Sequence, residues 1–153
     1  MNNAIGILNK FKFSVLSRIT GVEKSEIDST LTSKVAHQLY LRIVNNIDHE
    51  LVKYGFRKQG SINFIRTLGD CYQKINFQKS AYGPTMTANI AYQKPIVDDT
   101  ETLKHLLPNC KRLGVLDKGF DKWYPINRNY ESTISLLLSI FKDKVIPYLD
   151  KIE

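Results

Sequence analysis

The sequence predicts an α+β fold, in which an antiparallel sheet of about four to five strands packs with one face against helices from both ends of the chain. Three stretches carry this prediction. Apolar residues recur every four positions from Leu31 to Leu51, which is typical of an amphipathic helix. Apolar and polar residues alternate from Ile62 to Gln93, which is typical of strands with one buried face. A second helical pattern starts at Tyr130.

Length and composition are those of one ordinary globular domain, because the chain has 153 residues of which 42% are hydrophobic. We expect residues 1–30 to form an N-terminal extension, helical in character, and residues 31–153 to form a single α+β domain. The extension has apolar and basic positions at helical spacing, so it either docks on its own core or lies on a membrane or a partner. We favour the first alternative.

No secretory signal and no apolar run of membrane-spanning length is recognisable. The two cysteines, Cys71 and Cys110, lack any metal-binding or redox spacing. These features predict a protein of the reducing cytoplasm. Oligomeric state is not predicted.

The first helix of the domain is expected to begin after a cap at Ser29 or Thr30. It should end at Gly55, which is suited to the left-handed closing conformation and is followed by the apolar Phe56.

Two strands, residues 62–68 and 71–79, are joined by Gly69-Asp70, which predicts a two-residue hairpin turn and fixes the register. The expected partners are Leu68 with Cys71, Arg66 with Gln73, Phe64 with Ile75 and Ile62 with Phe77. With a turn at Ser80 to Gly83, a third strand follows that places Met86 beside Phe77, Ala88 beside Ile75 and Ile90 beside Gln73.

The opposite face of this three-stranded meander is mostly polar. It collects Asn63, Ile65, Thr67, Tyr72, Lys74, Asn76, Gln78, Thr85, Thr87 and Asn89. A solvent-exposed sheet face explains the threonines. Amides are poor strand formers that offer both donors and acceptors, so the predicted row of Asn63, Asn76 and Thr87 also fits a binding surface. Both interpretations stay open.

Later elements are a short helix over 98–107 ended by Pro108, strands over 111–116 and 122–126, and a final helix from Tyr130 that Pro147 should kink or end.

Catalytic motifs are lacking. No phosphate-binding loop, nucleophile elbow or metal-ligand spacing occurs, so we expect no metal and no cofactor. Arg66 points to the packed side in the predicted register, where a buried arginine needs partners; a position at the sheet margin or an anion-binding pocket are the alternatives. Trp123 either closes over the core or stacks on a ligand or base. A pocket near Arg66, Tyr92 and Trp123 would be the site of an enzyme.

The strings GFRKQG, just before the predicted hairpin, and INFQKS, in its second strand, resemble the bacterial domain-of-unknown-function family DUF4304 over about Ser33 to Leu149. The resemblance implies a small standalone α+β protein and carries over no catalytic residues. It marks as candidates the matching positions Gly55, Phe56, Lys58, Asn76, Gln78, Lys79 and Ser80.

Charge directs the functional hypothesis. Of the formal net charge of +7, a net +6 lies between Lys53 and Lys94, where seven cations face the single anion Asp70. We therefore expect a non-catalytic protein whose basic, amide-rich sheet face binds an acidic partner, above all a protein. By analogy with small bacterial proteins of similar size, this partner role would be that of an immunity or antitoxin protein. The candidate binding residues are Arg57, Lys58, Lys74, Asn76, Gln78 and Lys79. The alternative is a nucleic acid, with Tyr72 or Tyr82 stacking a base, and the enzyme is a third class.

Overall fold

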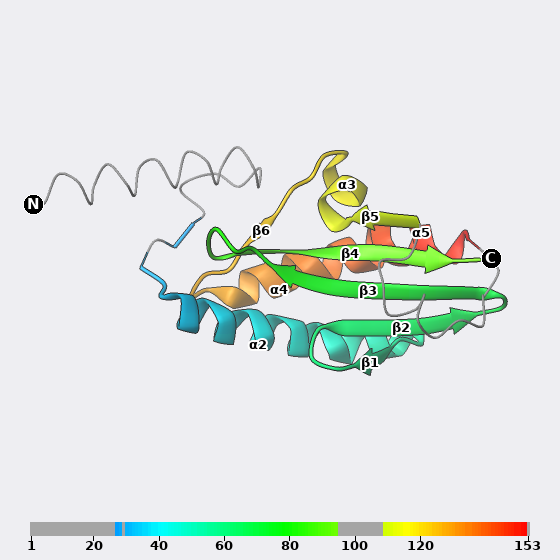
Figure 1. The fold of residues 1–153 in the computed structure, drawn as a ribbon, viewed down its shortest axis with the longest axis horizontal. Coiled ribbons are helices and arrows are strands. Elements are labelled where there is room, and N and C mark those ends of the chain that lie inside the picture. Colours follow the sequence, from blue (N-terminus) through cyan, green and yellow to red (C-terminus); the bar gives the residue numbers. More distant parts are fainter. Residues whose placement is uncertain (1–26, 29, 95–108, 153) are drawn as a thin grey trace, which may run out of the picture.

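The computed structural model describes residues 27–28, 30–94 and 109–152. The predicted α+β class is confirmed (Figure 1). The predicted extension over residues 1–30, apart from 27, 28 and 30, and the predicted helix over 98–107 lie outside the described residues.

One antiparallel sheet forms the centre of the fold, with strand order β1-β2-β3-β4-β5 and the short β6 paired to β4. The strands are β1 (Arg57–Gln59), β2 (Asn63–Leu68), β3 (Cys71–Lys79), β4 (Thr85–Gln93), β5 (Asn109–Arg112) and β6 (Tyr124–Pro125). The helices are α2 (Ser33–Leu51), α3 (Leu113–Lys118), α4 (Tyr130–Ile140) and α5 (Ile146–Asp150), with a 3-10 turn at Val52–Tyr54 and a π-helical turn at Phe141–Val145.

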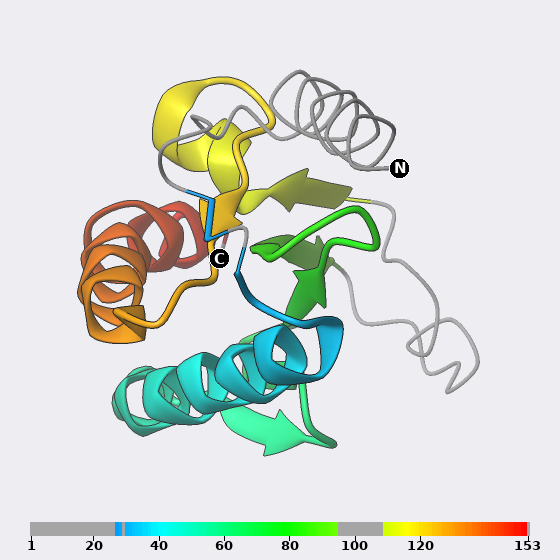
Figure 2. The same ribbon diagram turned by 90° about the vertical axis from the view of Figure 1, so that its left-hand side faces the viewer.

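Helices α2 and α4–α5 cover one side of the sheet, which we call the helix side (Figure 2). The core lies between these layers, where Ile43 and Ile47 of α2 and Phe141 of the π turn meet the strand residues Phe64 and Phe77. The other side, which we call the outer face, is turned toward the viewer in Figure 1. This layering confirms the predicted arrangement of helices.

Helix α2 starts later than predicted, because its cap is Thr32, whose side chain accepts a hydrogen bond from the Val35 N–H at 3.3 Å. Thr30 instead donates its backbone N–H to Asp28 at 3.0 Å, ahead of the helix. The predicted end is confirmed: Gly55 has φ +82°, and the Phe56 N–H donates to Leu51 at 3.2 Å.

The hairpin register was predicted correctly, with Leu68 opposite Cys71 and Phe64 opposite Ile75. The third strand is shifted by two residues from its prediction: Ala88 lies opposite Phe77 and Ile90 opposite Ile75. The cause is a longer loop, because the Ser80 N–H donates to the Thr85 carbonyl at 2.8 Å and the last strand pair is Lys79 with Met86. A shift of two keeps every side chain on its predicted face.

Two later segments differ in detail from what their residue patterns predict. The segment predicted as a strand over 111–116 changes after Arg112 into helix α3. The helix does not end at Pro147: the chain widens into a π turn before it, where the Ile146 N–H donates to the Phe141 carbonyl, and then continues as α5. Proline lacks the N–H that a regular turn would use here, so a wider turn accommodates it.

Candidate functional site

A row of polar side chains crosses five strands on the outer face. Asn76 in β3 lies directly opposite Asn63 in β2 and Asn89 in β4. Gln59 continues the row on β1 and Arg112 continues it on β5. We call these five residues the polar row. It matches the row predicted from the sequence, except that the shift of β4 puts Asn89 in the place of Thr87.

The three asparagines are joined by side-chain hydrogen bonds. Asn76 Nδ2 donates to Asn63 Oδ1 at 2.8 Å, and Asn89 Nδ2 donates to Asn76 Oδ1 at 3.2 Å. Asn89 Nδ2 also lies 3.4 Å from Gln78 Oε1. An amide has two N–H donors and two acceptor lone pairs, so Asn76 keeps one of each for another molecule. The ladder thus explains amides at positions where strand propensity opposes them.

Beside the polar row, Arg57, Ile65, Lys74 and Ala91 form the next row of the same face. Ile65 and Ala91 join Tyr72 in a small buried apolar cluster. Burial raises the pKa of the Tyr72 hydroxyl, and the nearby positive charge of Arg57 opposes this shift. The outer face therefore combines an apolar cluster, the polar row and, beside that row, the cations Arg57 and Lys74.

The structure places four of the six candidate binding residues on this face: Arg57, Lys74, Asn76 and Gln78. Lys58 and Lys79 lie on the helix side, since their strand partners are the core residues Phe64 and Met86.

Both of these helix-side lysines have local roles. Lys58 Nζ donates to Asn45 Oδ1 at 2.6 Å and lies 3.5 Å from an oxygen of Asp48, both on α2. Lys79 Nζ donates to the Ser80 carbonyl at 3.2 Å and lines a hollow of about 350 Å³ between the start of α2 and the β3–β4 loop.

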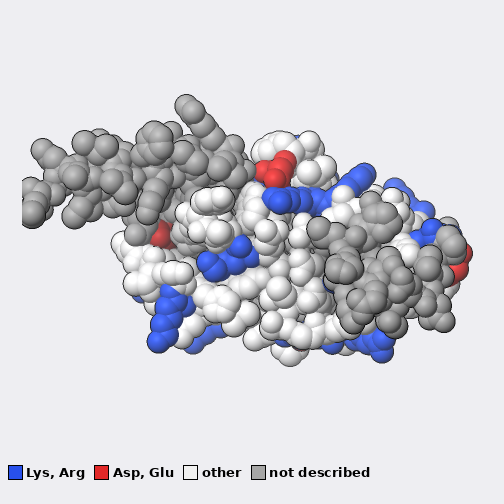
Figure 3. Space-filling view, viewed as in Figure 1, with Lys and Arg blue, Asp and Glu red and all other residues white. Residues whose placement is uncertain are grey.

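The central excess of positive charge is spread over both sides of the sheet. Lys53 pairs with Glu50 at 2.6 Å, and Lys94 lies 3.3 Å from Asp70. Figure 3 looks onto the outer face, where blue side chains are separated by uncharged surface. None of the six strands contains an Asp or a Glu, so the described sheet contributes cations and no carboxylates.

Arg112 marks the β5 end of the face. Its Nη1 lies 2.9 Å from Asp121 Oδ2, and its guanidinium lies 5.1 Å from the Trp123 ring centre. Trp123 itself is buried. Arg112 was not among the residues predicted for this face, because the strand that carries it could not be aligned with β4 from the sequence. The sequence did contain a signal for the three asparagines: they are equally spaced, at positions 63, 76 and 89, in two consecutive hairpins.

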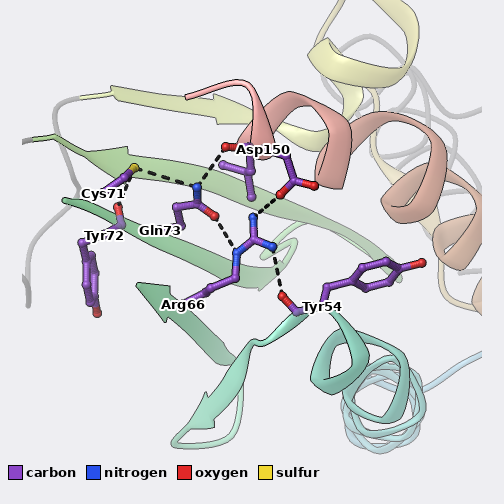
Figure 4. Close-up of polar contacts among 7 residues, drawn as sticks. Tyr54, Arg66, Cys71, Tyr72, Gln73 and Asp150 are labelled. Carbon is purple, nitrogen blue, oxygen red and sulfur yellow. Dashed lines mark hydrogen bonds and ion pairs between the residues drawn. The ribbon is translucent and has the colours of Figure 1, made fainter. Parts of the chain in front are cut away.

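Arg66 is buried on the helix side at the junction of the sheet with two helix ends (Figure 4). Its Nε donates to Gln73 Oε1 at 2.8 Å, and its Nη1 donates to the Tyr54 carbonyl at 2.9 Å. Its Nη2 lies 2.6 Å from Asp150 Oδ1, and its guanidinium covers the Phe56 ring at 4.7 Å. Gln73 in turn donates to the Leu149 carbonyl at 2.9 Å. The arginine therefore has the internal partners that its predicted burial required.

The three residues of the predicted enzyme pocket have separate partners in the structure. Tyr92 lies opposite Gln73 on the helix side, and its ring packs against Tyr148 at 6.5 Å between centres. Trp123 contacts Arg112. Arg112 lies on the outer face, because its strand partner is Asn89. Neither described hollow is lined by Tyr92 or Trp123.

In the part of the chain that the structure describes, no three His, Cys, Asp or Glu side chains gather in a way that could hold a metal ion. None of the described helices is long and apolar enough to cross a membrane.

Fold and site define an α+β protein with an antiparallel sheet that is covered by helices on one side and polar on the other. The chain belongs to the family described as Domain of unknown function (DUF4304), whose model matches residues 47–151. The resemblance found in the sequence is thereby confirmed, although the match starts inside α2 rather than at Ser33. No curated protein and no solved structure matches the chain.

Proposed function

We propose that this protein is a non-catalytic binding protein whose outer face docks an acidic partner protein. The observation that carries the proposal is the chemistry of the sheet: six strands without a carboxylate, and an outer face with the polar row beside Arg57 and Lys74. Cations speed the encounter with an acidic surface, and amides with a spare donor and acceptor fix the orientation.

On the outer face, a partner can reach the candidate residues rather than the whole sheet, because Tyr72, Thr87 and Ala91 on the same face are buried. Arg57 is exposed, and Lys74, Asn76 and Gln78 are partly exposed. Neither cation has an ion-pair partner among the described residues, so an incoming carboxylate would displace none of the described carboxylates. Cys71 and Cys110 are free thiols, which fits a place in the reducing cytoplasm.

The test is capture of a partner from the lysate of the native host by the tagged full chain, with and without nuclease. Lys74→Glu should abolish capture. Lys144→Glu is the matched control, because it makes the same charge change at an exposed position of the helix layer. A photo-crosslinking residue in place of Gln78 should label the captured protein, whereas one in place of Lys142 should not.

The outcomes separate the hypotheses. Capture that survives nuclease, is lost in Lys74→Glu and persists in Lys144→Glu supports the proposal. Capture that nuclease abolishes would replace the partner protein by a nucleic acid. Equal capture by both charge variants would rule out the outer face as the docking surface.

A further inference from the structure

A hollow of about 280 Å³ opens at the edge of the sheet where β1 begins. It is lined by Gly55, Arg57, Ile65, Arg66 and Thr67. The hollow exists because β2 is longer than its neighbour: β1 begins at Arg57, opposite Ile65, and β2 continues to Leu68. Gly55, at φ +82°, ends the preceding turn and adds no side chain to fill the space.

Backbone groups of β2 point into this hollow. The Ile62 carbonyl accepts a hydrogen bond from the Phe77 N–H at 2.9 Å, so even-numbered residues of this strand turn their backbone groups toward β3. Odd-numbered residues point the opposite way, since the direction alternates along a strand. Asn63 and Ile65 face β1. Thr67 lies beyond the last β1 pair, so no described strand runs beside it on the side away from β3.

The charge at the hollow is positive. Arg57 is exposed and has neither an ion-pair nor a hydrogen-bond partner among the described residues. Arg66 contributes its stem, because a Cβ at Gly55 would lie 3.6 Å from Arg66 Cδ, while its guanidinium is held by Gln73, Tyr54 and Asp150. None of the five lining residues is an Asp or a Glu, and Asp150, which contacts Arg66, is already paired with it.

We propose that this hollow binds one oxyanion group, a carboxylate or a phosphate, between the Arg57 guanidinium and the Thr67 N–H. Guanidinium groups and outward-facing backbone N–H groups are the donors that proteins use for such oxygens. The hydroxyl of Thr67, on the same edge, is a third donor. The oxyanion comes either from an acidic side chain of a partner or from a free phosphate; the first source rests on the proposed function and the second does not.

Backbone amide signals of the full-length chain report directly on the hollow. Inorganic phosphate and N-acetylglutamate amide are titrated separately into ¹⁵N-labelled protein, with sodium chloride at matched ionic strength as the blank. We expect saturable shifts at the Thr67 and Gly55 amides with at least one of the two probes. Arg57→Gln should weaken that binding at least tenfold, and Arg42→Gln, an exposed arginine of α2, should leave it unchanged.

The pattern of probes identifies the source. Saturation by the glutamate probe, together with loss of partner capture in Arg57→Gln, assigns the hollow to a partner's carboxylate. Saturation by phosphate alone, with capture retained in Arg57→Gln, assigns it to free phosphate. Absence of saturable shifts at Thr67, or shifts retained in Arg57→Gln, overturns the site. Lys74→Glu tests the proposed function separately, because it should abolish partner capture without affecting the Thr67 shifts.

Discussion

The guanidinium of Arg66 lies 2.6 Å from the carboxylate of Asp150, and this contact joins the second strand to the last helix across 84 residues of sequence. Arg66 is only 9% exposed, whereas the Asp150 side chain is 49% exposed. The two partners therefore contribute unequally, because the arginine alone also satisfies Gln73 and the Tyr54 carbonyl.

Arg66→Ala should lower the free energy of unfolding by about 3 kcal/mol, because it leaves buried hydrogen-bonding groups of Gln73 and Tyr54 without a partner. Asp150→Asn should cost about 1 kcal/mol or less, because its side chain remains solvated. Urea denaturation of both variants measures the difference. A loss in Arg66→Ala no larger than that of the exposed Arg42→Ala would contradict this role.

Asn76→Thr tests the asparagine ladder. Threonine is the better strand former, so the substitution should stabilise the protein if the ladder contributes nothing. Because Asn76 makes two ladder bonds, we expect instead a loss of about 1–2 kcal/mol. Gln59→Thr, at the end of the polar row, is the matched control and should be neutral within about 0.5 kcal/mol. Denaturation curves showing equal effects at both positions would reject the ladder as a stabilising feature.

The sequence was sufficient to predict both faces of the sheet and the first hairpin, because a two-residue turn leaves no freedom in register. It was not sufficient to align the third strand. In the loop between Lys79 and Thr85, the Ser80 N–H donates a hydrogen bond to the Thr85 carbonyl, and no residue pattern predicts this contact. The error left each side chain of β4 on its correct face of the sheet but gave it the wrong neighbours on β3. This is why Thr87 was predicted opposite Asn76, where Asn89 lies.

The candidate site was predictable in part for the same reason. Lys79 lies two residues after the core residue Phe77, and residues two apart in a strand share a face. Its helix-side position therefore followed from the strand pattern itself. The ion-pair partner of Arg66 could not be predicted in this way, because Asp150 is remote in sequence. The segment after Arg112 could not be assigned either, since a short apolar run reads equally as strand or helix until its packing is known.

Gly114 in α3 packs directly against the backbone of Lys122, so this position requires a residue without a side chain. A Cβ at this position would lie 2.7 Å from Lys122 Cα and closer still to the backbone N and O of Lys122. Gly114→Ala should therefore cost about 2–3 kcal/mol, because two backbone segments would have to move apart. Gly119→Ala, where φ is +81° and nothing lies within 4 Å, should cost about 1 kcal/mol through backbone strain alone. Thermal unfolding of the pair distinguishes crowding from strain, and equal losses would contradict the close approach.

The raised pKa of Tyr40 predicts how the free energy of unfolding changes at alkaline pH. Burial against the core raises the pKa of its hydroxyl from 10.0 to about 12, because the phenolate would lose its hydration. Below pH 10 both the folded and the unfolded chain keep the proton, and the stabilisation is fully present. Between pH 10 and 12 the unfolded chain loses it first, so the free energy of unfolding falls as pH rises. Tyr40→Phe removes this term and should lose less stability between pH 9 and pH 11 than the parent chain, by about 1 kcal/mol, because a difference of one proton contributes about 1.4 kcal/mol per pH unit. The variant should match the parent at pH 7, since the hydroxyl makes no hydrogen bond to the described residues. Chemical denaturation at each pH measures both curves, and parallel curves above pH 9 would show that Tyr40 ionises equally in the folded and unfolded chains.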